Sequence, residues 1–263
     1  MREIAWLQSI ASAELDVARK AFAAPHWNLT SFPSLGALLA KLGEQPFRMV
    51  AMAQPRRGVW TNADCEQVIA AAPLARLMGV HGSWCEGWQR TGHPWTGAEH
   101  CYWHQVPLRV RRWSRELTPP ATLSFAEQLG WSWNSNTDSG LVAGASISPD
   151  GPATERGILV SAAAAHRAAL GDALASLGWR LLQPDDAQRA VGVIWDGDVR
   201  IPADCRRLEQ LIALKLPTLA VTCAPRLQDW QALANLGASV LTKPYWLADL
   251  RDWLELPSPG SGD

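Results

Sequence analysis

The strongest constraint on the fold is a regular alternation of short apolar runs with helical patterns in residues 157–255. The apolar runs are 157–160 (GILV), 179–182, 191–195 (VGVIW), 218–221 (TLAV) and 239–241. Strands that are apolar on both faces are typical of parallel sheets that helices cover on both sides. We therefore predict that residues 157–255 form a doubly wound α/β domain around a five-stranded parallel sheet.

Residues 1–117 follow the same plan less clearly. The strands expected there are 4–7, 27–30, 48–53, 75–80 and 101–105, and the helices are 13–23, 35–42, 63–72 and 108–117. The fourth helix of the plan is replaced by a loop, residues 83–100, that is too rich in Gly, Pro and Trp to be helical. The chain is thus expected to contain two similar five-stranded units in tandem.

The stretch between the two units has the composition of a linker. Residues 118–156 begin with Thr118-Pro119-Pro120 and end in a Ser-, Gly- and Pro-rich segment. The last residues, 256–263, have the composition of a disordered tail. The predicted organisation is a first unit over 1–117, a linker over 118–156, a second unit over 157–255 and a tail over 256–263.

Three residues with charged or hydroxyl side chains lie at predicted strand ends of the second unit. They are Asp196, Thr222 and Lys243, the last followed by Pro244 and Tyr245. In doubly wound sheets the functional residues gather at the carboxyl ends of the strands. With this pattern, residues 157–255 resemble a response-regulator receiver domain. The resemblance implies a flavodoxin-like fold, Asp196 as phospho-acceptor, and Thr222 and Lys243 as contacts of the phosphoryl oxygens.

The second unit departs from that family where magnesium would bind. The family has an acidic pair after its first strand, and this chain has Ser161, Ala162 and Ala163 there. We therefore do not expect Mg²⁺ or any other cofactor, and we interpret residues 157–255 as a degenerate pseudo-receiver. The first unit resembles a receiver only in its order of elements, with Gln54 where the acceptor Asp would fall.

These features favour a non-enzymatic regulatory or scaffolding protein that binds a protein partner. The alternative that follows from the resemblance is a phospho-accepting response regulator that works through Asp196. With 24 Lys+Arg against 25 Asp+Glu, the chain is too balanced for a non-specific polyanion binder, so a nucleic-acid partner is not expected. The sequence contains neither a run of apolar residues long enough for a bilayer nor a secretory signal, so a cytoplasmic location is expected. Self-association is left open.

The loop of residues 83–100 and its flanks gather tryptophan, histidine and cysteine. Large amphipathic rings and Arg are frequent anchors of protein interfaces. The candidate partner-binding residues are Trp84, Trp88, Arg90, Trp95 and Trp103. The simpler interpretation is that these indoles only fold the loop onto its own sheet.

Two further alternatives make residues 81–104 part of an enzyme. Cys85, His100 and His104 offer ligands for a metal ion, and Cys85 beside His81 or His93 would form a nucleophile. No CxxC pair supports the metal site, and no third orienting residue is recognisable for the nucleophile.

Overall fold

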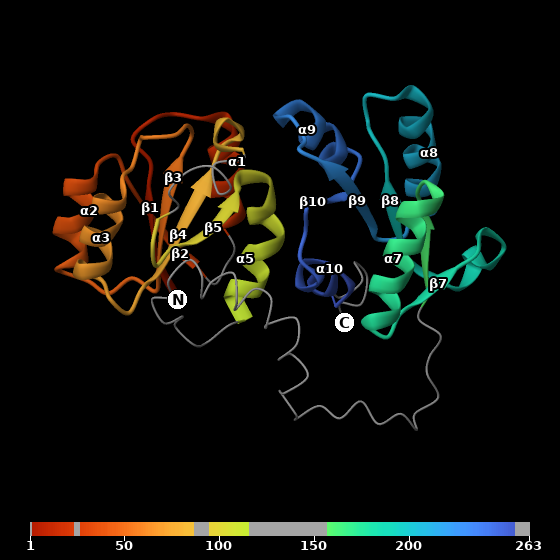
Figure 1. The fold of residues 1–263 in the computed structure, drawn as a ribbon, viewed down its shortest axis with the longest axis horizontal. Coiled ribbons are helices and arrows are strands. Elements are labelled where there is room, and N and C mark those ends of the chain that lie inside the picture. Colours follow the sequence, from red (N-terminus) through yellow and green to blue (C-terminus); the bar gives the residue numbers. More distant parts are fainter. Residues whose placement is uncertain (1, 24–26, 87–94, 116–156, 256–263) are drawn as a thin grey trace, which may run out of the picture. The chain divides into compact units, whose positions relative to one another are not determined.

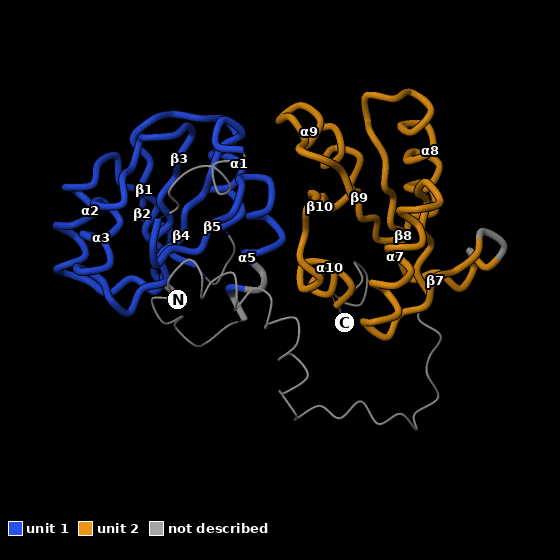
Figure 2. Tube along the Cα trace, viewed as in Figure 1, with its two compact units in different colours: residues 1–139 blue, residues 140–263 orange. Residues whose placement is uncertain are grey.

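The computed structural model describes residues 2–23, 27–86, 95–115 and 157–255, although the side chains of residues 2, 111, 112, 114, 115, 184, 185 and 187 are excluded. The chain divides into two compact units, Met1–Ser139 and Gly140–Asp263 (Figure 2). Each unit contains one five-stranded sheet with helices on both of its faces (Figure 1).

The first unit is an all-parallel sheet with the strand order β2-β1-β3-β4-β5. Its strands are β1 (Arg2–Leu7), β2 (Trp27–Phe32), β3 (Met49–Gln54), β4 (Arg76–His81) and β5 (Glu99–Tyr102). Its helices are α1 (Ala13–Ala21), α2 (Leu35–Leu42), α3 (Asn62–Ala71) and α5 (Val106–Arg115). This order is that of the flavodoxin-like fold, which receiver domains share.

Side chains of alternating strand positions build two cores in the first unit, one on each face of the sheet. Val50 and Met52 of β3 belong to a core cluster with Leu38 of α2 and Val68 of α3. On the other face, Trp6 of β1 packs against Phe22 at a ring-centroid distance of 5.9 Å. Both β3 and β4 are buried along their whole lengths, and their inner residues, 49–53 and 77–80, form continuous apolar runs in the sequence.

The second unit repeats the fold. Its strand order, read from the other edge of the sheet, is β7-β6-β8-β9-β10, which matches β2-β1-β3-β4-β5 of the first unit strand for strand. Its strands are β6 (Gly157–Ser161), β7 (Arg180–Leu182), β8 (Ala190–Asp196), β9 (Thr218–Cys223) and β10 (Ser239–Lys243), all parallel. Its helices are α7 (Ala164–Ser176), α8 (Pro202–Ile212), α9 (Leu227–Asn235) and α10 (Leu247–Leu254), with a 3-10 segment, η3, over Pro184–Arg189. The prediction of two tandem flavodoxin-like units is confirmed.

The prediction for the last strand of the first unit was wrong in its bounds. The sequence pattern placed it at 101–105, whereas β5 covers Glu99–Tyr102 and a 3-10 turn, η2 (Trp103–Gln105), follows it. The side chain of Gln105 accepts a hydrogen bond from the backbone N–H of Tyr102 at 2.9 Å, which caps this turn directly after the strand. His104 therefore lies in this turn and not on the strand face where His100 lies.

Part of the predicted organisation falls on residues outside the described ranges. These are the linker 118–156, the tail 256–263 and the central part of the 83–100 loop. The described beginning of that loop is a single 3-10 turn, η1 (Ser83–Cys85). Among the described residues, no helix is both long and apolar enough to cross a membrane.

Candidate functional site

The carboxyl edge of the second sheet carries the three residues that the sequence singled out there. Asp196 is the last residue of β8, Thr222 is the fifth of the six residues of β9, and Lys243 is the last residue of β10. Strand β9 lies between the other two, so Asp196 and Lys243 approach each other across the end of β9. This edge of the second unit is the candidate site.

Asp196 and Lys243 form a close ion pair at this edge. Lys243 Nζ donates to Asp196 Oδ1 at 2.8 Å and to Oδ2 at 2.7 Å. The Asp196 side chain is only 7% exposed, so the charge is screened little by water. The Thr222 hydroxyl is not a hydrogen-bond partner of either side chain in the described part of the chain. The three residues therefore share an edge, but only two of them touch.

The pair has two further neighbours, of which His166 was not found from the sequence and Tyr245 belongs to the motif that follows Lys243. His166, in the first turn of α7, places Nδ1 3.3 Å from Asp196 Oδ2 and 3.5 Å from Lys243 Nζ. The pKa of Tyr245 is raised, first by its burial and then by the negative charge of Asp196. The available signal for His166 was its place in the helix that follows the first strand of the unit, since that helix begins at the functional edge.

The position of the acidic pair in receivers is occupied here by a small, uncharged segment. Ser161 ends β6 and is followed by Ala162 and Ala163, directly before α7. Arg207 of α8 reaches this segment, with Nε 3.4 Å from Ser161 Oγ. A guanidinium thus contacts the segment in which the family has carboxylates.

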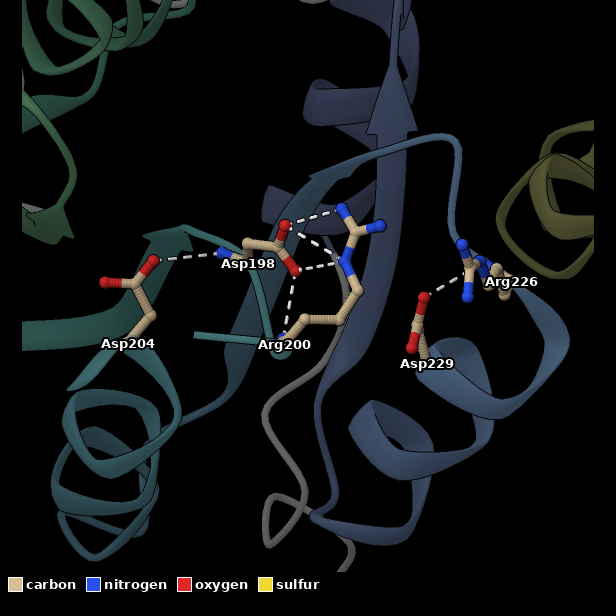
Figure 3. Close-up of polar contacts among 5 residues, drawn as sticks. All are labelled: Asp198, Arg200, Asp204, Arg226 and Asp229. Atoms are coloured by element: carbon tan, nitrogen blue, oxygen red, sulfur yellow. Dashed lines mark hydrogen bonds and ion pairs between the residues drawn. The ribbon is translucent and has the colours of Figure 1, made fainter. Parts of the chain in front are cut away.

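Asp198, the carboxylate that follows Asp196 by two residues, is engaged within its own loop (Figure 3). Arg200 Nε lies 2.7 Å from Asp198 Oδ1 and 3.0 Å from Oδ2, and these hydrogen bonds hold the pKa of the carboxyl below its usual range. Asp204 accepts a hydrogen bond from the backbone N–H of Asp198 at 3.1 Å, and Asp229 accepts one from that of Arg226 at 3.2 Å. These carboxylates hold loops and helix ends together.

Among the residues described in the first unit, the equivalent edge carries no such charge pair. Gln54, at the end of β3, is fully buried, and its Oε1 accepts a hydrogen bond from the backbone N–H of Trp60 at 3.1 Å. Its register partner on β4 is His81, and Gly82 follows at the position that corresponds to Thr222. No receiver-like site is carried by these residues.

A buried histidine pair lies between β4 and β5 of the first unit. His81 Nε2 is 2.8 Å from His100 Nδ1, and His100 Nε2 is 3.2 Å from the carbonyl oxygen of Trp95. Burial lowers the pKa of His81 well below its ordinary value and lowers the pKa of His100 to about 4. Both rings are therefore neutral at neutral pH.

The structure does not assemble the metal site that Cys85, His100 and His104 suggested. Among the described residues, no group of three His, Cys, Asp or Glu side chains converges in a way that would hold a metal ion. His104 sits in the turn after β5, where burial, with a further contribution from the charge of Arg109, lowers its pKa to about 3.

Cys85 lacks the properties of an activated nucleophile. Its side chain is buried, and its thiol lies 3.4 Å from the carbonyl oxygen of Gln54, to which it donates. Burial raises the pKa of this thiol to about 11, so the reactive thiolate is scarce at neutral pH. His93 lies outside the described residues.

The candidate partner-binding residues separate into two groups. Trp95 and Trp103 are buried, and Trp103 Nε1 donates to Ser83 Oγ at 3.1 Å. Trp84, in contrast, is 83% exposed. Trp88 and Arg90 lie outside the described residues. The simpler interpretation, that indoles pack the loop onto the sheet, thus holds for Trp95 and Trp103, and Trp84 is the described member of the set that faces solvent.

Comparisons with known proteins find similarities to solved structures that extend over nearly the whole chain. No family model and no curated protein matches the sequence. Among solved structures, the chain is similar to the E. coli RcsC C-terminus, which contains a linker region and a phosphoreceiver domain, with 15% identity, a TM-score of 0.29, and coverage of 96% of this chain and 91% of that one. It is also similar to a putative two-component response regulator/GGDEF domain protein, with 10% identity, a TM-score of 0.31, and coverage of 97% and 98%. A second such protein has 11% identity, a TM-score of 0.29 and coverage of 95% of both chains. The receiver-like fold itself rests on the strand order of each sheet.

Proposed function

We propose that the chain is a non-enzymatic regulatory or scaffolding protein, in which residues 157–255 are a pseudo-receiver that does not accept a phosphoryl group. The observation that carries the proposal is the missing acidic pair, since Ser161, Ala162 and Ala163 occupy the segment after β6 where receivers have two carboxylates. Carboxylate oxygens at that place would hold the divalent cation that phosphoryl transfer uses.

The charges around Asp196 also argue against phosphoryl transfer. In that reaction a divalent cation neutralises the charge that develops on the phosphoryl oxygens. Here the segment after β6 carries Ser161 and two alanines, and the guanidinium of Arg207 lies beside them. Asp198 is already paired with Arg200. These features argue against a magnesium site at this edge and support a role in which the protein acts through its surfaces.

The phospho-accepting response regulator is the second candidate, because one observation favours it. A lysine at the end of the fifth strand contacts an aspartate at the end of the third, which is the pairing that the receiver resemblance requires. The two candidates differ in what magnesium and a phosphoryl mimic do to the protein.

The test compares the thermal unfolding of the second unit, within the full chain, in the presence and absence of Mg²⁺ and beryllofluoride. A competent site at a hundredfold excess of ligand over Kd would stabilise the protein by about 2.7 kcal/mol. We expect no shift, and no incorporation of phosphate from acetyl phosphate. A clear shift in the wild type that disappears in Asp196→Asn would establish the response regulator instead.

A further inference from the structure

The first sheet ends on one side in β2, an edge strand that lacks the usual protection against pairing with another chain. Native proteins protect such edges with charged side chains, prolines, bulges or short strands. The other edge strands of the two described sheets, β5, β7 and β10, have four, three and five residues, and each carries a charge, on Glu99, Arg180 and Lys243. Strand β2 (WNLTSF) has six residues, none of them charged and none proline, and its register with β1 is continuous.

The backbone groups of two central residues of β2 point away from the sheet. The N–H of Gln8 donates to the carbonyl oxygen of Phe32 at 3.0 Å, so the backbone of Phe32 bonds toward β1. In a parallel pair, alternate residues of a strand bond to the same neighbour. The N–H and C=O groups of Leu29 and Ser31 are therefore directed outward, and within the described residues no hydrogen bond to them is found.

The middle of β2 is accessible while both of its ends are fixed. Trp27 and Phe32 are buried, and the four residues between them are exposed or half-buried. Phe32 belongs to the core cluster that also contains Leu38 and Leu42 of α2. A strand that is already extended and anchored in this way loses little conformational entropy when another strand pairs with it.

The geometry of this edge matches a second copy of itself. A two-fold axis perpendicular to the sheet at Leu29 would place β2 of two molecules antiparallel, with Leu29 opposite Leu29 and Asn28 opposite Thr30. Residues that face each other then lie on the same side of the joined sheet, as an antiparallel ladder requires. Leu29, whose backbone groups point outward, would form the central hydrogen-bonded pair. Such an isologous contact is closed after two copies.

The charge pattern also favours a second copy over a foreign segment. A second copy brings the same charges to the contact, so a charged edge repels itself, and an uncharged one does not. The carboxylate on the adjoining strand, Glu3, is engaged in its own molecule, because Asn28 Nδ2 donates to its two oxygens at 3.0 and 2.9 Å. A peptide of another sequence would find no charge on β2 by which it could be selected.

From this arrangement we infer that β2 is a dimerisation edge, at which two copies of the chain pair antiparallel about Leu29 and join their first sheets into one of ten strands. The inference goes beyond the proposed function, because it names a second copy as a partner. It uses the first unit alone and is independent of what Asp196 does.

Sedimentation equilibrium of the full chain over a range of concentrations tests the dimer. We expect a reversible monomer–dimer equilibrium. Ser31→Lys, at an exposed position, should raise its Kd at least about tenfold, because it adds an ammonium group to each copy of the edge. Leu29→Pro should weaken the dimer as well, since it removes an outward N–H, and proline is tolerated on edge strands at such positions. Gln67→Lys, on the exposed face of α3, adds the same charge elsewhere and should dimerise as the wild type does.

Disulfide formation tests the register of the two strands. In a Cys223→Ser background, which removes the exposed native thiol, Leu29→Cys should give a covalent dimer under mild oxidation. The two Cα atoms would be about 5.5 Å apart, a separation that a disulfide spans. Ser31→Cys is the matched control, because Ser31 is more exposed, yet its two copies would be separated by four residues along the strands.

Three results would overturn the inference. The first is a chain that stays monomeric at every concentration, whatever else binds to β2. The second is a dimer that Ser31→Lys, folded as judged by circular dichroism, leaves as tight as in the wild type. The third is cross-linking of Ser31→Cys as fast as that of Leu29→Cys, which would mean random collision or another register.

Discussion

Lys243 Nζ lies within 2.8 Å of both carboxylate oxygens of Asp196, and this contact joins the third and fifth strands of the second sheet across the end of β9. The carboxylate is nearly buried and the ammonium group is partly so. His166 adds a second nitrogen on the solvent side of the pair. If the pair has a structural role and is not a reaction site, its removal should lower the stability of the second unit.

Lys243→Met should therefore destabilise the second unit by about 2 kcal/mol, because it leaves a buried carboxylate without its cation. The double variant Asp196→Asn/Lys243→Met should lose less than the sum of the two single variants, since the unpaired charge is then absent. Urea denaturation measures the stability of the single and double variants, and hydrogen exchange of β8 reports on the second unit. Arg206→Met, an exposed position of α8, is the control and should be within about 0.5 kcal/mol of the wild type. An unchanged stability of Lys243→Met would contradict this account.

The ends of the parallel strands were the part of the site that the sequence could predict. Buried apolar runs locate the strands, and the residue that ends each run must lie at the carboxyl edge, which brings Asp196 and Lys243 to one place. His166 and Arg207 could not be placed in the same way, because they project from helices, where a small rotation decides which edge a long side chain reaches. The Glu99–Tyr102 strand was misplaced because its polar Glu99 and His100 conceal a half-buried strand.

The tryptophan loop illustrates the other limit. Its composition predicted that indoles would gather, and it gave no way to tell the buried Trp103 from the exposed Trp84. That distinction depends on the hydrogen bond from Trp103 to Ser83 and on the bonds that Glu14 makes to the same serine, from 69 residues away in the chain. Contacts at that separation leave no periodic signal in a single sequence.

The thiols should differ strongly in their rates of alkylation. Cys85 is buried and its pKa is raised to about 11, whereas Cys223 is exposed at the end of β9. We expect iodoacetamide at pH 8 to label Cys223 quickly and Cys85 only after urea is added. Peptide mass spectrometry of the time course measures both sites in one sample. Rapid labelling of Cys85 in the native protein would revive the interpretation of Cys85 as a nucleophile.

Two glycine-to-alanine changes in the first unit should have opposite signs. A Cβ at Gly36, inside α2, meets nothing within 4 Å, so Gly36→Ala should stabilise the unit by about 0.5–1 kcal/mol. A Cβ at Gly79 of β4 would lie 2.9 Å from His81 Nε2 and 3.0 Å from His100 Nδ1. Gly79→Ala should therefore cost about 1–3 kcal/mol through overpacking. Chemical denaturation of the two variants side by side checks the sign, and equal effects would mean that the histidine pair tolerates an added methyl group at Gly79.

The buried histidines should also make the first unit sensitive to acid. The pKa of His100 is lowered from 6.5 to about 4 by burial, and that of His104 to about 3. In the unfolded chain both rings take up a proton as the pH falls through 6.5, while in the folded unit they stay neutral until a much lower pH. Proton uptake thus favours the unfolded state over this interval, so the stability is fully present above pH 6.5 and declines from about pH 6.5 to about pH 3.

The expected loss is large enough to measure. At 1.36 kcal/mol for each pKa unit, His100 alone accounts for about 2 kcal/mol at pH 5 and about 3 kcal/mol once the pH has fallen below its folded pKa of about 4. The second unit is the internal control, because its one histidine, His166, is 57% exposed. Hydrogen exchange at pH 7.5 and pH 5 should therefore show the protection of β4 and β5 falling more than that of β8 and β9. Replacing His100 with Gln should reduce this pH dependence even if it lowers the stability at pH 7.5, because a glutamine at that position cannot take up the proton. Equal losses of protection in the two units, or an unchanged slope in the His100→Gln variant, would show that acid acts on groups other than these histidines.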